Sequence, residues 1–266
     1  MNDAPLGVFD SGIGGLTVAR ALFERLPHEA VLYFGDTARV PYGPKSPETV
    51  RRYSAEILAY LLGRGVKAVV VACNTSTAHA LDHLRSRASV PVVGVIEPGA
   101  RAAVAASRSG TIGVIGTMGT VASGAYERAI KALRPDATVV SAACPLFVPL
   151  VEEGWFDHPA AELIAREYLE PLRRSGVDVV VLGCTHYPLL KPLLQRVLGA
   201  GVQLIDSAEE TAAQVVKELA ARDLAASARP RPEHVFAVSD DEPRFRRVGE
   251  RFLGERLKQV SVVPLG

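Results

Sequence analysis

GVDVVVLGCTHYP, at residues 176–188, is the stretch that decides the fold. Residues 179–182, VVVL, are apolar and mostly β-branched, which is typical of a strand buried on both faces of a parallel sheet. Polar residues follow the strand directly, Cys184 and His186 among them. Open α/β sheets bind their ligands at the carboxyl ends of such strands. We therefore expect a ligand site at Cys184 and His186.

A second stretch repeats this pattern earlier in the chain. Residues 65–76 read GVKAVVVACNTS, and Cys73 occupies the position that Cys184 has in the first stretch. The strands expected in 1–97 recur in the same order across 111–206, and helices separate them. A repeat of this length predicts two similar α/β lobes with mainly parallel sheets, related by pseudo-twofold symmetry, with the active site in the cleft between them.

The domain boundaries are predicted from this repeat. The first lobe is expected to comprise residues 1–97 and 208–266, and the second lobe residues 98–207. Within the C-terminal segment, residues 227–232, SARPRP, predict an exposed linker.

Local signals predict the ends of several elements. Ser46 followed by Pro47 predicts a helix start, and Ser207 with Glu210 predicts a capping box that opens a helix over 208–224. We also expect a strand over 90–96, helices over 99–107 and 121–133, and an irregular loop over 146–159.

Composition excludes several classes of protein. The 266 residues are 48% hydrophobic and 22% charged with a net charge of +1, which is ordinary for a globular chain with real cores. No basic surface or membrane-length apolar run is visible, so we expect a cytoplasmic protein with no membrane and no direct nucleic-acid partner. Three cysteines without paired spacing favour a reducing compartment.

The cysteines suggest the chemistry. A lone cysteine is usually a small buried hydrophobe, and Cys144, which has no twin, is interpreted in this way. The matched pair Cys73 and Cys184 is different, because both lie at corresponding strand ends. A disulfide redox pair usually has Cys-x-x-Cys spacing, and a zinc site of these three cysteines with His186 would lack the paired spacing of structural sites. The favoured hypothesis is proton transfer on both faces of a carbon centre, which inverts it and needs no metal or cofactor.

Asp10 and His186 fit as assistants to the two thiols. A thiol with a pKa near 8.5 is only a few per cent ionised at neutral pH, which costs about 2 kcal/mol. A helix N-terminus returns about 0.3–1 kcal/mol, and up to about 2 kcal/mol when it is partly buried. His186 can supply more by hydrogen bonding or charge. The charge of Asp10 opposes a thiolate, so Asp10 must accept or orient the thiol proton.

The turn at residues 12–15, GIGG, partly resembles a dinucleotide fingerprint. Thr17 at the third glycine position and the charge of Asp10 disfavour a phosphate there. The glycines are instead expected to let backbone amides approach a substrate carboxylate at the helix N-terminus. Helix capping or hydrogen bonding to a substrate with two carboxylates and an ammonium are the alternatives for Ser11, Asn74, Thr75 and Thr185.

Taken together, these motifs resemble those of the glutamate racemases, cofactor-independent bacterial enzymes that make D-glutamate for peptidoglycan. The matching stretches are FDSGIGG (9–15), YFGDTARVPYG (33–43), ACNTS (72–76), CPLFVPLVEEG (144–154), GCTHYP (183–188) and IDSA (205–208). Racemases of aspartate or other amino acids resemble the chain in the paired cysteines. His186 after Cys184-Thr185 and the loop at 41–43 favour glutamate.

The resemblance also implies roles. Cys184 would take the α-proton of L-glutamate and Cys73 that of D-glutamate, with Asp10 and Glu152 assisting on one side and His186 on the other. Choosing Glu152 rather than Glu153 follows the family pattern. The substrate contacts implied are Asp10, Ser11, Tyr42, Gly43, Asn74, Thr75, Thr117, Thr120, Thr185 and His186. The family is often dimeric, so a homodimer is expected, and an inhibitory role toward DNA gyrase, known for some members, is neither encoded nor excluded.

Overall fold

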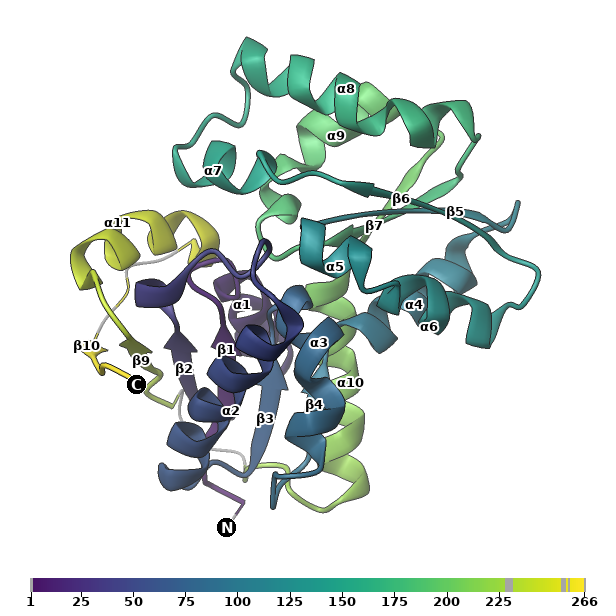
Figure 1. Ribbon diagram of the computed structural model, residues 1–266. Coiled ribbons are helices and arrows are strands. Elements are labelled where there is room, and N and C mark those ends of the chain that lie inside the picture. The colour runs from purple at the N-terminus through teal and green to yellow at the C-terminus, as the bar shows by residue number, and fades with distance from the viewer. Residues whose placement is uncertain (1, 228–231, 255–256, 258, 266) are drawn as a thin grey trace.

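The computed structural model of the chain describes residues 2–227, 232–254, 257 and 259–265 (Figure 1). Two separate parallel sheets, each flanked by helices, confirm the predicted α/β class with two lobes. Residues 228–231 of the expected linker lie outside the described residues.

The first sheet has the strand order β10-β9-β2-β1-β3-β4, and each neighbouring pair is parallel. Its central strands are buried along their whole length, as their continuous apolar sequences predict. The strands are β1 (Leu6–Asp10), β2 (Val31–Gly35), β3 (Ala68–Val71), β4 (Val92–Gly94), β9 (Val235–Val238) and β10 (Val260–Val262). The helical elements of this lobe are α1 (Leu16–Arg25), η1 (Thr37–Arg39), α2 (Pro47–Gly63), α3 (Asn74–Arg85) and α11 (Glu242–Leu253).

The second sheet has the order β6-β5-β7-β8, again with parallel pairs only. Its strands are β5 (Thr111–Gly116), β6 (Thr138–Ala143), β7 (Val179–Gly183) and β8 (Gln203–Asp206). The helical elements around it are α4 (Ile96–Ala106), α5 (Met118–Ala122), α6 (Ala125–Leu133), α7 (Phe147–Glu152), α8 (Pro159–Arg174), η2 (Tyr187–Leu190) and α9 (Lys191–Leu198). Helix α10 (Ser207–Ala221) packs against α1 of the first lobe and α4 of the second.

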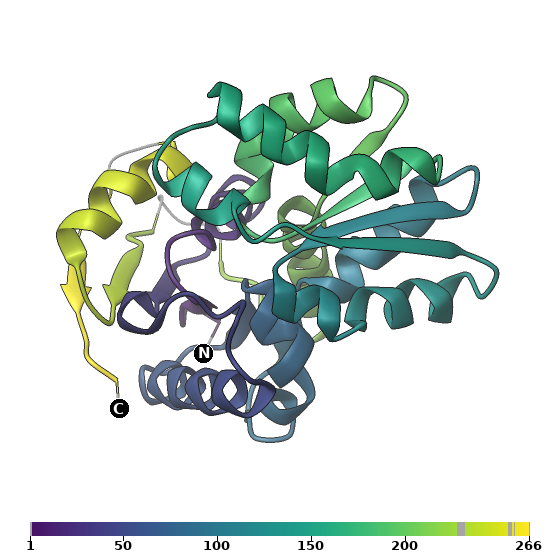
Figure 2. The same ribbon diagram turned by 45° about the horizontal axis from the view of Figure 1, so that its top comes forward.

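The C-terminal segment extends the first sheet. Strand β9 lies parallel to β2, with Leu32 opposite Val235, and β10 lies parallel to β9. Helix α11 of the same segment lies beside α7 of the second lobe in both views of the molecule (Figures 1 and 2). The last part of the chain therefore belongs to one sheet and contacts the other lobe.

Three expected elements differ from the structure. The strand expected over 90–96 is limited to β4, and α4 begins at Ile96, because Pro98 is tolerated in the first turn of a helix. The helix expected over 121–133 is divided into α5 and α6 by Gly124, whose φ of 64° is left-handed. The loop expected over 146–159 contains α7, which buries Phe147 and Val151 in the core.

The helix starts give one confirmation and one correction. Ser46 caps α2 by accepting a hydrogen bond from the amide of Thr49, with Pro47 in the first turn, as predicted. The capping box of Ser207 and Glu210 is wrong. Asp206 caps α10 through the amide of Ala208 at 2.9 Å, because the helix begins one residue earlier than expected.

None of the helices in the described part of the chain is long and apolar enough to cross a membrane.

Candidate active site

A cavity of about 380 Å³ lies where the carboxyl ends of strands from both sheets meet. Most of the predicted site residues line it: Ser11, Tyr42, Gly43, Cys73, Asn74, Thr75, Thr117, Glu152, Cys184, Thr185 and His186. Two others, Asp10 and Thr120, are buried next to lining residues. The two halves of the sequence repeat therefore share one cavity, because the parallel strands of each sheet end at the same edge.

The two matched cysteines are almost equally buried, at 5% exposed for Cys73 and 6% for Cys184. Cys73 precedes α3 and its Sγ accepts a hydrogen bond from the amide of Ser76 at 3.4 Å. Burial, followed by the negative charge of Asp10, raises the pKa of Cys73 to about 11. Cys73 is therefore a neutral thiol at pH 7.

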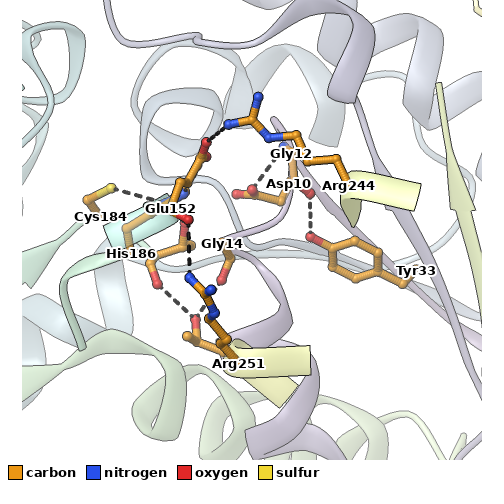
Figure 3. A network of polar contacts seen from close by, with 11 residues as sticks. Asp10, Gly12, Gly14, Tyr33, Glu152, Cys184, His186, Arg244 and Arg251 are labelled. Atoms are coloured by element: carbon orange, nitrogen blue, oxygen red, sulfur yellow. Dashed lines mark hydrogen bonds and ion pairs between the residues drawn. The ribbon is translucent and has the colours of Figure 1, made fainter. Parts of the chain in front are cut away.

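Cys184 faces a positive charge instead. His186 Nδ1 lies 3.9 Å from Cys184 Sγ, and His186 Nε2 lies 3.0 Å from Glu152 Oε1 (Figure 3). Burial lowers the pKa of His186, but the contacts with Cys184 and Glu152 outweigh it and raise this pKa to about 10. His186 is therefore an imidazolium at neutral pH, held between a carboxylate and a sulfur atom.

Glu152 lies on a different side of the site from the one that the family resemblance implied. Its carboxylate contacts His186 rather than Asp10, because α7 ends beside the loop that follows β7. Burial raises the pKa of Glu152, but His186 and Arg244 lower it further than burial raises it. The grouping of Glu152 with Asp10 is thus corrected. Glu152 contacts the ring nitrogen of His186 that faces away from Cys184, so it lies on the Cys184 side of the site.

Asp10 is buried at the end of β1. Its Oδ2 accepts a hydrogen bond from the amide of Gly12 at 3.0 Å, while its Oδ1 has no hydrogen-bond partner among the described residues. Burial raises the pKa of Asp10, and the charge of His186 partly opposes this. An unpaired buried oxygen of this kind is costly unless it serves a ligand or a proton.

The glycines of the turn allow close packing around these groups. A Cβ on Gly14 would lie 2.2 Å from Thr185 Oγ1 and 2.4 Å from His186 Nδ1, and a Cβ on Gly15 would lie 2.4 Å from Asp10 Cβ. The carboxylate that the amide of Gly12 binds is that of Asp10 itself. These glycines let the two lobes place His186 and Asp10 against the same turn.

Polar side chains of Asn74, Thr75, Thr117 and Thr120 form one wall of the site, called the polar wall below. The hydroxyls of Thr75, Thr117 and Thr120 lie 2.9–3.2 Å apart and join α3 of the first lobe to α5 of the second. Asn74 accepts a hydrogen bond from the Tyr126 hydroxyl at 2.7 Å, which leaves its Nδ2 donor without a partner among the described residues. This donor belongs to a residue that lines the cavity, where an anionic ligand can accept from it.

Two further residues, Asp36 and Tyr126, hydrogen-bond to residues that line the cavity, and sequence reasoning assigned neither to the site. Asp36 accepts a hydrogen bond from the hydroxyl of Tyr42, a residue that lines the cavity, so the proton of this hydroxyl is not available to a ligand. Asp36 follows directly after β2 and lies in a quoted motif, which was an available signal. No sequence signal marked Tyr126.

The structure offers little support for a metal site. Among the described residues, no group of three or more His, Cys, Asp or Glu side chains is arranged to hold a metal ion. Cys144 is fully buried in the core and does not line the cavity.

Known proteins resemble this chain in both sequence and structure. The profile of the Asp/Glu/Hydantoin racemase family matches residues 15–215. A glutamate racemase from Geobacter metallireducens is 56% identical over 98% of this chain and 96% of its own length. The structure of a glutamate racemase isoform from Bacillus anthracis has a TM-score of 0.95 and 41% identity over 99% of this chain and 98% of its own. A glutamate racemase from Francisella tularensis, solved in complex with D-glutamate, has a TM-score of 0.93 and 37% identity over 99% of this chain and 98% of its own.

The chain therefore belongs to the Asp/Glu racemase family and, within it, to the glutamate racemases. It is an isomerase that acts on an amino acid.

Proposed function

We propose that this chain interconverts L- and D-glutamate by two proton transfers, one at Cys184 and one at Cys73. The observation that carries the proposal is the asymmetry of the two thiols. Both are equally buried in one cavity, but only Cys184 contacts an imidazolium, while Cys73 lies next to a carboxylate. One thiolate and one thiol facing the same substrate are what inversion by two bases requires.

In the direction from L- to D-glutamate, the thiolate of Cys184 takes the α-proton and becomes a thiol. The electron pair of the broken C–H bond remains on the substrate as a carbanion. The thiol of Cys73 then delivers its proton to the opposite face and becomes a thiolate. The atoms balance, since one proton enters and one leaves, and the reverse direction exchanges the two roles.

The assisting residues act through charge and orientation. His186 stabilises the thiolate of Cys184, and Glu152 keeps His186 protonated and oriented. Asp10, whose free Oδ1 is buried near Cys73, is proposed to orient or accept the proton of that thiol.

The substrate is proposed to lie between the polar wall and the glycine turn. Ser11, Asn74, Thr75, Thr117, Thr120, Thr185 and the backbone of Tyr42 and Gly43 are the proposed contacts. The unpaired Nδ2 of Asn74 supports this placement. The Francisella tularensis relative was solved in complex with D-glutamate, which supports glutamate as the substrate.

Racemisation in deuterated water tests the mechanism. Metal-stripped protein is incubated with L-glutamate, and both enantiomers are separated and analysed by mass. Early D-glutamate should carry deuterium while the recovered L-glutamate stays mostly protiated, because two separate bases exchange with solvent on opposite faces. Equal early labelling of both enantiomers would show that a single base acts.

Cysteine variants test the assignment. Cys73→Ala and Cys184→Ala should each abolish racemisation, whereas Cys144→Ala, the matched control, should keep it. Loss of the buried Cys144 side chain costs roughly 1–2 kcal/mol of stability through lost packing. A well-folded Cys144→Ala variant without activity would contradict the two-thiol assignment.

We further propose a homodimer, a cytoplasmic role in supplying D-glutamate for peptidoglycan, and lobes divided at residues 97 and 207. The dimer is tested by light scattering, in which a mass near 28.3 kDa would show a monomer.

A further inference from the structure

Helix α11 reaches across from the first lobe to the residues behind Cys184. Three of its side chains contact them, and Figure 3 shows two of these, Arg244 and Arg251. Arg244 Nη2 lies 2.9 Å from Glu152 Oε2, Arg251 Nη1 lies 3.4 Å from the backbone oxygen of Glu152, and the ring of Phe252 packs edge-on against His186 at 5.2 Å between centroids. Helix α11 therefore contacts both Glu152 and His186.

The two carboxylate oxygens of Glu152 have different partners. Oε1 accepts from His186 Nε2 at 3.0 Å, and Oε2 accepts from Arg244 at 2.9 Å. A carboxylate held at one oxygen only can rotate about its terminal bond, which has a broad energy minimum. Held at both, it presents Oε1 to His186 in one orientation.

The residues that follow Glu152 leave room for the arginines of α11. Glu152 ends α7, and Gly154 follows with a φ of 78°, a conformation that glycine adopts readily. A Cβ on Gly154 would lie 2.7 Å from Arg251 Nη1, so a larger residue would displace the arginine. Arg251 also places a positive charge at the C-terminal end of α7, where the helix dipole favours it.

We propose that Arg244 is a positioning residue for the Cys184 side of the reaction, fixing the carboxylate of Glu152 that orients His186. This inference rests on the proposed function. A residue of the C-terminal segment then assists proton transfer at Cys184, which belongs to the other lobe. Proton transfer at Cys184 therefore reaches its full rate only when α11 is packed against Glu152.

The test compares Arg244→Ala with Arg247→Ala. Arg247 is an exposed arginine on the same helix, and no hydrogen bond or ion pair joins it to Glu152 or His186 in the described structure. Because Arg244 is 45% exposed, Arg244→Ala should stay folded, which circular dichroism checks. The expected loss in kcat/KM is about threefold to tenfold for Arg244→Ala, and less than about twofold for Arg247→Ala.

Three measurements separate positioning from a general structural effect. The primary isotope effect with α-deuterated L-glutamate should rise more than that with α-deuterated D-glutamate, because only the transfer at Cys184 is slowed. In a Glu152→Gln background, Arg244→Ala should cause almost no further loss, since its effect passes through Glu152. Arg244→Lys, which keeps the charge, should recover part of the activity.

An equal loss from Arg244→Ala in both backgrounds, or an isotope effect skewed toward the D form, would overturn the proposal. Failure of the proposed function gives a different result, namely racemisation that survives Cys184→Ala. The two outcomes are therefore distinguishable.

Discussion

The resting enzyme should be alkylated at Cys184 before Cys73. Both thiols line the same cavity and differ by only one percentage point in exposure, so access to a small reagent is matched. The difference in rate then reports their ionisation, because the thiolate is the form that reacts with iodoacetamide.

The magnitude follows from the surroundings of each thiol. With a pKa of about 11, Cys73 is ionised in about one molecule in 10,000 at pH 7, against about 3% for an ordinary thiol. The stronger nucleophilicity of a more basic thiolate recovers about tenfold, which leaves Cys73 about 30-fold slower than a free cysteine. At Cys184 the neighbouring charge is positive instead, since Nδ1 of the His186 imidazolium lies 3.9 Å from the sulfur.

The assay is a time course with a limiting amount of iodoacetamide at pH 7, read by peptide mass spectrometry. Cys184 should be modified about 30-fold faster than Cys73 in the wild type, which is the disadvantage worked out for Cys73. In His186→Asn the rate at Cys184 should fall by at least tenfold, while the rate at Cys73 should change little. Equal rates at the two cysteines of the wild type would refute the assignment of one thiolate and one thiol.

Three further predictions follow from the same charges and contacts. Asp10→Asn should speed alkylation of Cys73 while slowing racemisation, since the Asp10 carboxylate raises the pKa of that thiol; an unchanged alkylation rate would contradict this. Protonation of His186 stabilises the fold fully below its unfolded pKa of about 6.5, and this contribution is lost as the pH rises through about 10. The melting temperature of the wild type should therefore exceed that of His186→Asn most near pH 6, and the gap should narrow toward pH 10. Gly14→Ala should lower kcat/KM by at least about tenfold by displacing His186, whereas Gly63→Ala, where a Cβ meets no atom within 4 Å, should leave activity intact.

The features predicted correctly from the sequence are those encoded locally. Strands β3 and β7 are continuous apolar runs that end in a cysteine, and both the burial and the strand-end position follow from about ten residues each. The repeat then predicted that Cys73 and Cys184 meet in one cavity.

What sequence reasoning missed depends on contacts between distant segments. Helix α7 lies within the irregular loop that was expected over residues 146–159. It forms because Pro149 falls in the first turn and Phe147 and Val151 gain burial against the core. The position of that helix decides which side of the site Glu152 serves. Arg244 lies 92 residues after Glu152 in the sequence, so no local pattern could pair them.

The unequal charges around the two thiols have to be reconciled with a reaction whose equilibrium constant is one. Because the two enantiomers are equally stable in achiral solvent, kcat/KM must be the same in both directions. The imidazolium of His186 and the carboxylate of Asp10 both favour the form with its thiolate on Cys184, so the form with its thiolate on Cys73 is scarce. For the two values of kcat/KM to be equal, the scarce form must react with D-glutamate faster than the abundant form reacts with L-glutamate, by the ratio of their populations. The structure contains the means for this, since a raised pKa makes the thiolate of Cys73 the stronger base. The same asymmetry drives the enzyme back, after each D-glutamate is released, to the form that accepts L-glutamate.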